Sequence, residues 1–423
     1  MENSRRRLAL IDTTEPRPQS APLILGRSKD QELLTLYGCI QTNTTMGIEG
    51  VRETWFFVIA ALIGATFQSF ESIAFGVLEA TFPELIDWVG ISGVVSSIPT
   101  KETLVITKQN SPLVVASVHN AKFSIGFKFK EHHGNREVSV KYVPYISIEI
   151  TDEIPLKDFL ELLYHVRNFL ALAVGHSIYP DSISLLTQNV KAVLPDGTPF
   201  RTPIELVFHN VNWGVPHEAV NIRGMLFELN KVQHRFESVL TNWLDKVELL
   251  EPIHSMYFGT LYNPNMFLHQ KFLSLVLCLE SYHRRRGHNL ELPPEEGKKR
   301  VDDIVNVAPE QHRKWLKNKL RYSNELTLRR RLKELVESFS FVEVGNQGQF
   351  IEDVVNTRNY HIHYDEELKK LSADPTKMSM LALRLAALTE AILLVEIGLT
   401  LDEVKLITQR IKQRQSELRS FDF

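Results

Sequence analysis

Cysteine is scarce in this sequence, which contains Cys39 and Cys278 and no others among its 423 residues. Two cysteines so far apart exclude a disulfide framework and a cysteine-rich zinc site, and they are typical of a reducing compartment. The longest apolar run, residues 55–67, is too short to cross a bilayer, so we interpret it as buried core. The arginines at 5–7 are not followed by an apolar core long enough for a signal peptide, which argues against one. We therefore expect a cytoplasmic protein with no membrane partner.

Strong net charge is also lacking, because the formal total is only -3. This balance excludes a chain that binds polyanions by its overall charge. The charge is nevertheless uneven: residues 281–333 contain 15 Lys and Arg against 7 Asp and Glu, which leaves about -11 for the remainder. A hydrophobic fraction of 43% and a length of 423 residues predict a globular protein of two domains.

The first half of the chain is patterned mainly as strands. Residues 1–30 are polar and carry three prolines, and we interpret them as a loose leader. Helix and strand cannot be told apart by pattern in residues 32–107. Apolar side chains then alternate through residues 113–150, which predicts an antiparallel meander, and helical spacing predicts a helix over 156–174. We therefore predict a β-rich domain over residues 31–215.

The second half, residues 216–423, has helical spacing throughout. Asn263 before Pro264 predicts a helix start, and Thr400 with Glu403 predicts a capping box. The fold class that we predict is α+β, with a β-rich N-terminal domain followed by an all-α bundle. The expected helices cover residues 222–247, 264–282, 324–339, a segment that begins at 350, residues 375–395 and a last one after Thr400.

Polar residues interrupt the apolar stripe of the helix that begins at residue 350. Phe350, Ile351, Val354 and Val355 have amphipathic spacing, but the next position on the stripe is Arg358. A guanidinium at the edge of a buried stripe requires an anionic partner, a second subunit or a ligand, because burying an unpaired charge is costly. The side chains that follow include Asn359, His361 and His363. They add an amide and two groups that titrate near neutral pH.

Two other interpretations of this segment remain open. Arg358 could be a surface arginine that pairs with Glu352, Asp353 or Asp365. His361 and His363 could also bind a metal together with Asp365. However, side chains two positions apart diverge on a helix, and the sequence has no further cluster of ligands. We therefore expect no metal and no other cofactor.

The spacing from Arg358 and Asn359 to His363 resembles the catalytic signature of the HEPN ribonucleases, which are helical domains that cut RNA without metal. Longer segments resemble the ApeA family, whose members join a β-rich N-terminal domain to a C-terminal HEPN domain and act in bacterial defence against phage. These segments are residues 223–229, Trp243, residues 272–284 and residues 355–365. The resemblance is strongest over residues 220–400.

The resemblance implies an endoribonuclease with Arg358, Asn359 and His363 as catalytic residues. Histidine can accept the proton of the ribose 2′-OH or protonate the leaving 5′-oxygen, and arginine matches phosphate oxygens with two parallel hydrogen bonds. The products would be a 2′,3′-cyclic phosphate and a 5′-hydroxyl, and DNA would resist because it lacks the 2′-OH. Positions five apart differ by about 140° on a regular helix, so either the helix is distorted or ends there, or two chains complete one site.

Further residues are candidates for supporting roles. His361, Tyr364 and Glu280 are candidate neighbours of the catalytic groups. The basic triplets could guide RNA or could be solvated helix faces. Their candidate RNA-binding residues are Arg284, Arg285, Arg329 and Arg330.

The expected partners are RNA, such as transfer RNA with its exposed loops, a second copy of the chain in a homodimer, and a phage-derived trigger. A function of another class stays open: the helical half could be a non-enzymatic dimerisation or interaction module, with Arg358 in a structural ion pair.

Overall fold

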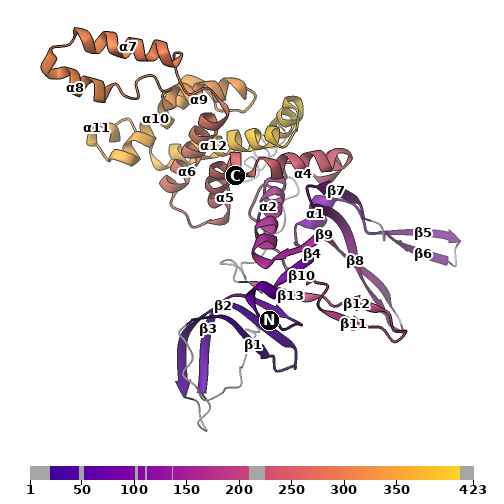
Figure 1. The fold of residues 1–423 in the computed structure, drawn as a ribbon. Coiled ribbons are helices and arrows are strands. Elements are labelled where there is room, and N and C mark those ends of the chain that lie inside the picture. The colour runs from indigo at the N-terminus through magenta and orange to yellow at the C-terminus, as the bar shows by residue number, and fades with distance from the viewer. Residues whose placement is uncertain are drawn as a thin grey trace. The chain divides into compact units, whose positions relative to one another are not determined.

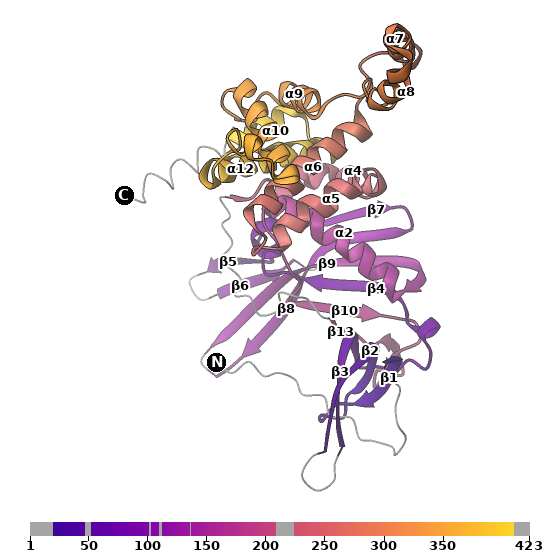
Figure 2. The same ribbon diagram turned by 90° about the vertical axis from the view of Figure 1, so that its left-hand side faces the viewer.

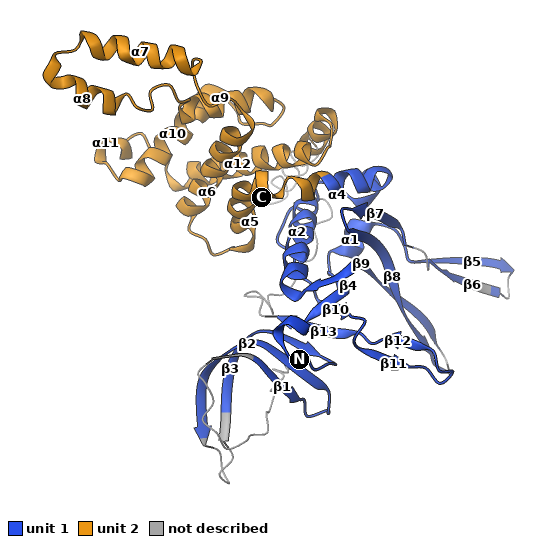
Figure 3. Cartoon of the chain, viewed as in Figure 1, with its two compact units in different colours: residues 1–241 blue, residues 242–423 orange. Residues whose placement is uncertain are grey.

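The computed structural model describes residues 20–46, 52–100, 103–109, 112–135, 137–208 and 224–409. The chain forms two compact units, residues 1–241 and residues 242–423, which Figure 3 shows in two colours. The domain boundary that we predicted between residues 215 and 216 lies outside the described part and stays a prediction. The first unit is rich in strands and the second consists of helices, so the predicted α+β fold class is confirmed.

One large antiparallel sheet dominates the described part of the first unit (Figure 1). Its nine strands are, in spatial order, β1 (Ser20–Arg27), β2 (Leu33–Met46), β3 (Arg52–Ile63), β13 (Ile204–Phe208), β10 (Ser182–Leu186), β4 (Ala74–Thr81), β9 (Val138–Pro155), β8 (Ala121–His133) and β7 (Val114–Val118). The smaller elements are α1 (Leu85–Val89) and the hairpins β5 (Val94–Thr100) with β6 (Thr103–Lys108) and β11 (Lys191–Val193) with β12 (Pro199–Arg201).

The predicted meander and the helix after it are both confirmed. Strands β7, β8 and β9 follow one another in the chain and pair in register, with Phe123 opposite Ile148. Both of these side chains are buried, because alternate positions of a strand point to one face. Helix α2 (Leu156–Val174) packs against β4 and β9 and buries Phe159 and Phe169. This packing forms the core of the first unit.

Two predictions for the first half need correction. Strand β1 lies within residues 1–30, so the part of the predicted leader from Ser20 to Arg27 is paired in the sheet. The apolar run at 55–67 contains most of β3, and only some of its side chains are buried. Trp55, Phe57 and Ile59 are exposed, because one face of this strand has no cover among the described residues.

The predicted continuous helix over residues 222–247 is broken into several pieces. The structure has α3 (Leu229–Val232), a 3₁₀ turn, α4 (Phe236–Asp245) and α5 (Val247–Tyr262). The backbone N–H groups of Leu226 and Phe227 donate to the carbonyl of Ala173 at the end of α2. These contacts hold the start of the segment against the end of α2, and the extended backbone of Glu228 interrupts the predicted helix.

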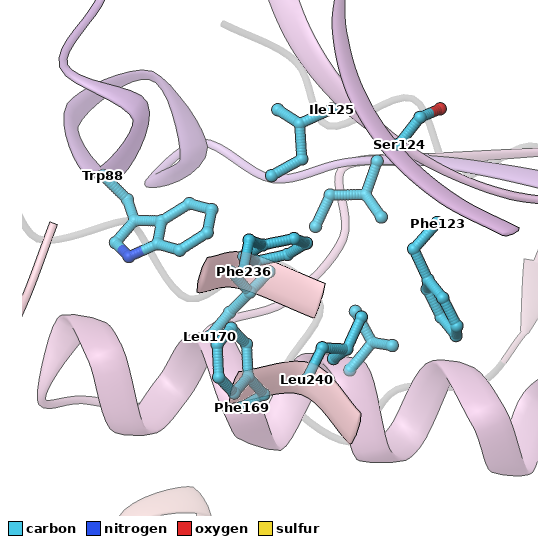
Figure 4. Close-up of a pocket in the computed structure, with 10 residues that line it drawn as sticks. Trp88, Phe123, Ser124, Ile125, Phe169, Leu170, Phe236 and Leu240 are labelled. Atoms are coloured by element: carbon cyan, nitrogen blue, oxygen red, sulfur yellow. The ribbon is translucent and has the colours of Figure 1, made fainter. Parts of the chain in front are cut away.

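A small cavity lies between α1, α2, α4 and the sheet of the first unit (Figure 4). Its volume is about 10 Å³, which is near the lower limit for a single water molecule. Trp88, Phe123, Phe169 and Phe236 are among the apolar side chains that line it. The cavity is therefore a packing defect of the core and has no room for a ligand.

Helix α6 (Leu268–Arg286) is central in the second unit, because it packs against both α5 and α12 (Pro375–Glu396). It buries Phe272, Leu275 and Leu279, while α12 buries Leu385 and Leu388 against it. Helix α6 also contacts α9 (Leu328–Ser338) and α10 (Gln347–His363). After α5, the helices are α6 (Leu268–Arg286), α7 (Pro294–Val307), α8 (Glu310–Lys319), α9 (Leu328–Ser338), α10 (Gln347–His363), α11 (Glu366–Lys369) and α12 (Pro375–Glu396).

The predicted capping box at Thr400 is confirmed, whereas the helix start predicted at Asn263 is wrong. The side chain of Asp374 accepts a hydrogen bond from the backbone of Lys377 at the start of α12, and Thr400 and Glu403 form the expected capping box. Asn263 instead follows the end of α5, and α6 begins at Leu268. By length and composition α12 could cross a membrane, but 56% of that segment is buried, as in the core helix of a domain.

Candidate functional site

The candidate residues lie at the C-terminal end of α10. Asn346 caps the start of this helix by accepting a hydrogen bond from the backbone of Gln349 at 3.0 Å. The helix ends at His363, because Tyr364 adopts a left-handed conformation with φ of 52°. Arg358, Asn359 and His361 are partly exposed in the last two turns, and His363 is exposed. Arg358 and His363 therefore both lie within one helix, which ends at His363 itself.

Arg358 has almost no partner of its own among the described residues. One nitrogen, Nη1, donates to Oδ1 of Asn359 at 3.1 Å. Nε is buried without a hydrogen bond, and no described carboxylate lies within ion-pair distance of the guanidinium. Leaving a charged donor unsatisfied is unfavourable, so Arg358 is poised to receive an anion.

The three carboxylates considered as partners of Arg358 are engaged elsewhere. Glu352 pairs with Arg329 of α9. Asp353 is nearly buried and pairs with Lys377 of α12, with 2.8 Å between Nζ and Oδ2. Asp365 caps α11 by accepting a hydrogen bond from the backbone of Glu367 at 2.8 Å. These contacts leave the predicted alternative, a structural ion pair at Arg358, without support within the described part of one chain.

His361 is paired with a histidine that sequence reasoning missed. Its ring stacks on His269 of α6 with centroids 5.6 Å apart, and His269 in turn stacks on Phe267 at 5.8 Å. Burial and the neighbouring His269 lower the pKa of His361 below its ordinary value. Its Nδ1 is buried without a hydrogen bond among the described residues. His361 is therefore biased toward the neutral form, which can accept a proton.

The remaining predicted residues of this helix end face solvent. His363 and Tyr364 are exposed, and His363 makes no hydrogen bond or ion pair with another described residue. The alternative metal site at His361, His363 and Asp365 gains no support. Within the residues that the structure describes, no three His, Cys, Asp or Glu side chains form a group that could hold a metal ion.

Comparison with protein families assigns both halves of the chain. The family model described as ApeA N-terminal domain 1 matches residues 3–243, which is more than half of the sequence. The model described as Apea-like HEPN matches residues 273–403, which include the whole of α10. The chain belongs to the ApeA family. No curated protein and no solved structure matches it.

The match to the ApeA-like HEPN domain contains Arg358, Asn359, His361 and His363, whereas His269 lies four residues before it. His269 escaped sequence reasoning because its partner His361 is far away in the chain. The helix that we predicted to start at Pro264 placed His269 in its second turn. In the structure α6 begins at Leu268, so His269 lies in the first turn.

Glu280 lies on α6 of the HEPN domain and pairs with Arg284 at 3.2 Å, so it is not a partner of Arg358. Arg284 also pairs with Glu325 at 3.1 Å. Arg285 donates to the backbone carbonyls of Glu248 and Leu249. Glu280 and these two arginines are thus held by contacts within the protein.

The two candidate RNA-binding residues on α9 are also paired. Arg329 pairs with Glu352, and Nε of Arg330 lies 2.8 Å from Glu334. Direct contacts from these two arginines and from Arg284 and Arg285 to RNA remain a prediction. Within the protein, their positive charge is largely balanced by carboxylates and carbonyls.

Proposed function

We propose that this ApeA-family protein is a metal-independent endoribonuclease that acts in bacterial defence against phage, with the end of α10 as its active site. One observation carries the proposal: Arg358 has no carboxylate partner among the described residues, yet it lies on the same helix end as Asn359, His361 and His363. A guanidinium left open beside titratable imidazoles fits a phosphodiester substrate.

The reaction is a transesterification followed by product release. A histidine takes the proton of a ribose 2′-OH, and the 2′-oxygen forms a bond to phosphorus while the bond from phosphorus to the 5′-oxygen breaks. The leaving oxygen receives a proton from an acid, and a 2′,3′-cyclic phosphate remains. Arg358 binds the phosphate oxygens as negative charge accumulates on them, and Asn359 orients that guanidinium. His363 is our candidate for proton transfer, since its exposed ring is accessible to RNA.

A second copy of the chain would complete this site. Arg358 and His363 point in directions that differ by about 140° on a regular helix, so one α10 alone presents them poorly to one phosphate. Two helix ends related by a two-fold axis would supply two arginines and two histidines around one cleft. Exposed apolar side chains beside the site fit such an interface: Ile362 and Tyr364 flank His363, and Leu371 follows α11.

The proposal also covers the substrate of the nuclease and the regulation of its activity. Transfer RNA is the proposed substrate, because unstacked loop nucleotides let a 2′-OH align with the adjacent phosphate. The β-rich N-terminal half would keep the nuclease silent until a phage-derived trigger binds.

Cleavage of total RNA by the purified full-length chain in excess EDTA tests the function, with the ends of the products mapped. We expect cutting that resists EDTA, leaves cyclic phosphate ends and disappears in His363→Ala. His133→Ala, which removes an exposed histidine of the first unit, is the matched control and should cut normally. Cutting that EDTA abolishes would contradict the metal-free mechanism. No cutting, even in lysates of phage-infected cells, would favour the interaction module.

A further inference from the structure

The hairpin of α7 and α8 buries few of its residues. In both views these two helices project from the remaining helices (Figures 1 and 2). Helix α8 has no fully buried residue, and α7 buries only Gly297 and Val305. The hairpin therefore contributes little to the core. Its surface residues are not constrained by packing and can take part in binding.

A clamp of hydrogen bonds holds the base of this hairpin. The side chain of Asn324 donates to the carbonyl of Leu292 at 2.9 Å and accepts from the backbone N–H of the same residue at 3.1 Å. The backbone of Glu291 donates to the carbonyl of Asn324 at 2.8 Å. The close approach of Asn324 also requires glycine at 297, where an added Cβ would lie 2.3 Å from Nδ2. The hairpin is therefore a defined arm that is fastened at its base.

Positive charge on the arm is concentrated on α8 and the turn after it. Residues 311–324 contain five Lys or Arg and no Asp or Glu. Helix α7 carries basic and acidic residues in nearly equal number, so it lacks this excess. The basic residues of α8 and the turn after it are Arg313, Lys314, Lys317, Lys319 and Arg321, and all five are exposed.

These basic groups are less neutralised than the four arginines considered above. Lys314 and Lys319 pair with no carboxylate among the described residues. Lys317 lies 3.9 Å from Asp302, and both side chains are well exposed, so this contact is weak. Arg313 donates to backbone carbonyls and not to an acid. The arm thus keeps its positive charge available to an external anion.

Two exposed aromatic rings lie among these charges. Trp315 is 59% exposed and Tyr322 is 66% exposed, which is unusual for side chains of this size. On a helix Trp315 lies beside Lys319, four residues later, and the guanidinium of Arg321 lies 5.9 Å from the ring of Tyr322. Cations interleaved with open aromatic faces match single-stranded nucleic acid, in which bases stack on the rings and phosphates pair with the cations.

We propose that the arm formed by α7 and α8 is an RNA-binding element, with Lys314, Lys317 and Lys319 on phosphates and Trp315 on an unstacked base. It binds single-stranded RNA and delivers it to the nuclease site, so the inference rests on the proposed function for its substrate class. It also replaces the paired arginines Arg284, Arg285, Arg329 and Arg330 as the main source of RNA affinity.

Binding of a labelled single-stranded RNA oligonucleotide tests the arm, using the full-length chain with His363→Ala so that no RNA is cut. We expect the combined variant Lys314→Gln, Lys317→Gln and Lys319→Gln to show a shallower decrease of log affinity with log salt. The magnitude of the negative slope should fall by about 2, since each single-strand phosphate contact contributes about 0.7. Trp315→Ala should weaken binding roughly five-fold or more with little change in that slope. A double-stranded RNA of equal length should bind more weakly than the single strand.

The matched control changes the same charge on the first unit, through Lys122→Gln, Lys128→Gln and Lys130→Gln on β8, where all three lysines are exposed. It should leave RNA affinity nearly unchanged. Equal losses in both triple variants, unchanged affinity in the α8 variant, or no RNA binding at all would overturn the proposal. So would binding to phosphatidylserine vesicles that depends on α8 while RNA affinity does not. The proposed nuclease function is tested separately, by comparing RNA cleavage by the wild type with cleavage by His363→Ala. The RNA-binding arm and the nuclease function can therefore each be refuted independently.

Discussion

Arg331 on α9 and Arg358 on α10 are two arginines of the same helical unit in contrasting surroundings. Arg331 is fully buried and donates to the carbonyl of Leu326, to Asn289 at 2.7 Å and to Nδ1 of His283 at 3.1 Å. Arg358 is partly exposed and donates to Asn359 alone among the described residues.

The neighbouring histidines differ in the same way. His283 is buried, accepts from Arg331 at Nδ1 and lies 2.8 Å from Glu334 at Nε2, so both ring nitrogens have partners. His361 has no hydrogen bond at Nδ1, and His363 is exposed. The same residue types thus form a buried, hydrogen-bonded cluster at α9, in which Nη2 of Arg331 lacks a partner among the described residues, and a partly exposed cluster at the end of α10. Burial and the number of hydrogen bonds, rather than residue type, distinguish the cluster on α9 from the candidate site on α10.

Arg331→Met should have the largest effect on stability, because it removes the donor to His283, Asn289 and Leu326 inside the protein. We expect the free energy of unfolding to fall by about 3 kcal/mol. Denaturant titration of the full-length chain measures this. Lys333→Ala, an exposed position on the same helix, should change stability by less than about 0.5 kcal/mol. An unchanged stability in Arg331→Met would remove the structural side of the comparison.

A smaller, pH-dependent effect is expected at His361. Its pKa is below the ordinary 6.5, so as pH falls the unfolded chain binds a proton before the folded one does. This histidine therefore costs no stability above pH 6.5 and costs progressively more as pH falls toward its folded pKa. His361→Gln should reduce the loss of stability between about pH 7 and pH 5, measured by denaturant titration at both values. An equal reduction in His133→Gln would show that the effect is not specific to the site.

The smallest effect should come from the contact that ties α10 to α12. Lys377 pairs with Asp353 at 2.8 Å, but Lys377 is exposed, so Lys377→Met should cost about 1 kcal/mol or less. RNA cleavage should persist, since Arg358 lies more than one turn beyond Asp353 along α10. Lys369→Met, in an exposed pair with Glu366, serves as the control and should cost still less. Complete loss of cleavage in Lys377→Met would show that the site depends on the placement of α10.

Local pattern predicted much of this fold, and distant pairing accounts for what it missed. The meander, α2, α10 and the caps at Asp374 and Thr400 depend on residues close in sequence. By contrast, β3 pairs with β13 across more than 130 residues, and no periodicity encodes that neighbour.

The candidate site shows the same division. The motif on α10 was visible in the sequence, but the stacking of His269 on His361 and the pairing of Arg329 with Glu352 join separate helices. Residues 281–333 therefore looked equally basic along their length in the sequence. The structure distinguishes the arginines that pair with carboxylates from the exposed lysines of α8.

Arg358→Ala tests the central claim most directly, with RNA cleavage in excess EDTA and the melting temperature measured on the same preparation. Because Arg358 has no ion-pair partner among the described residues, we expect cleavage to fall by roughly a hundred-fold or more while the melting temperature stays unchanged. A melting temperature lowered by several degrees with cleavage retained would contradict the account, because it would make Arg358 a structural residue like Arg331.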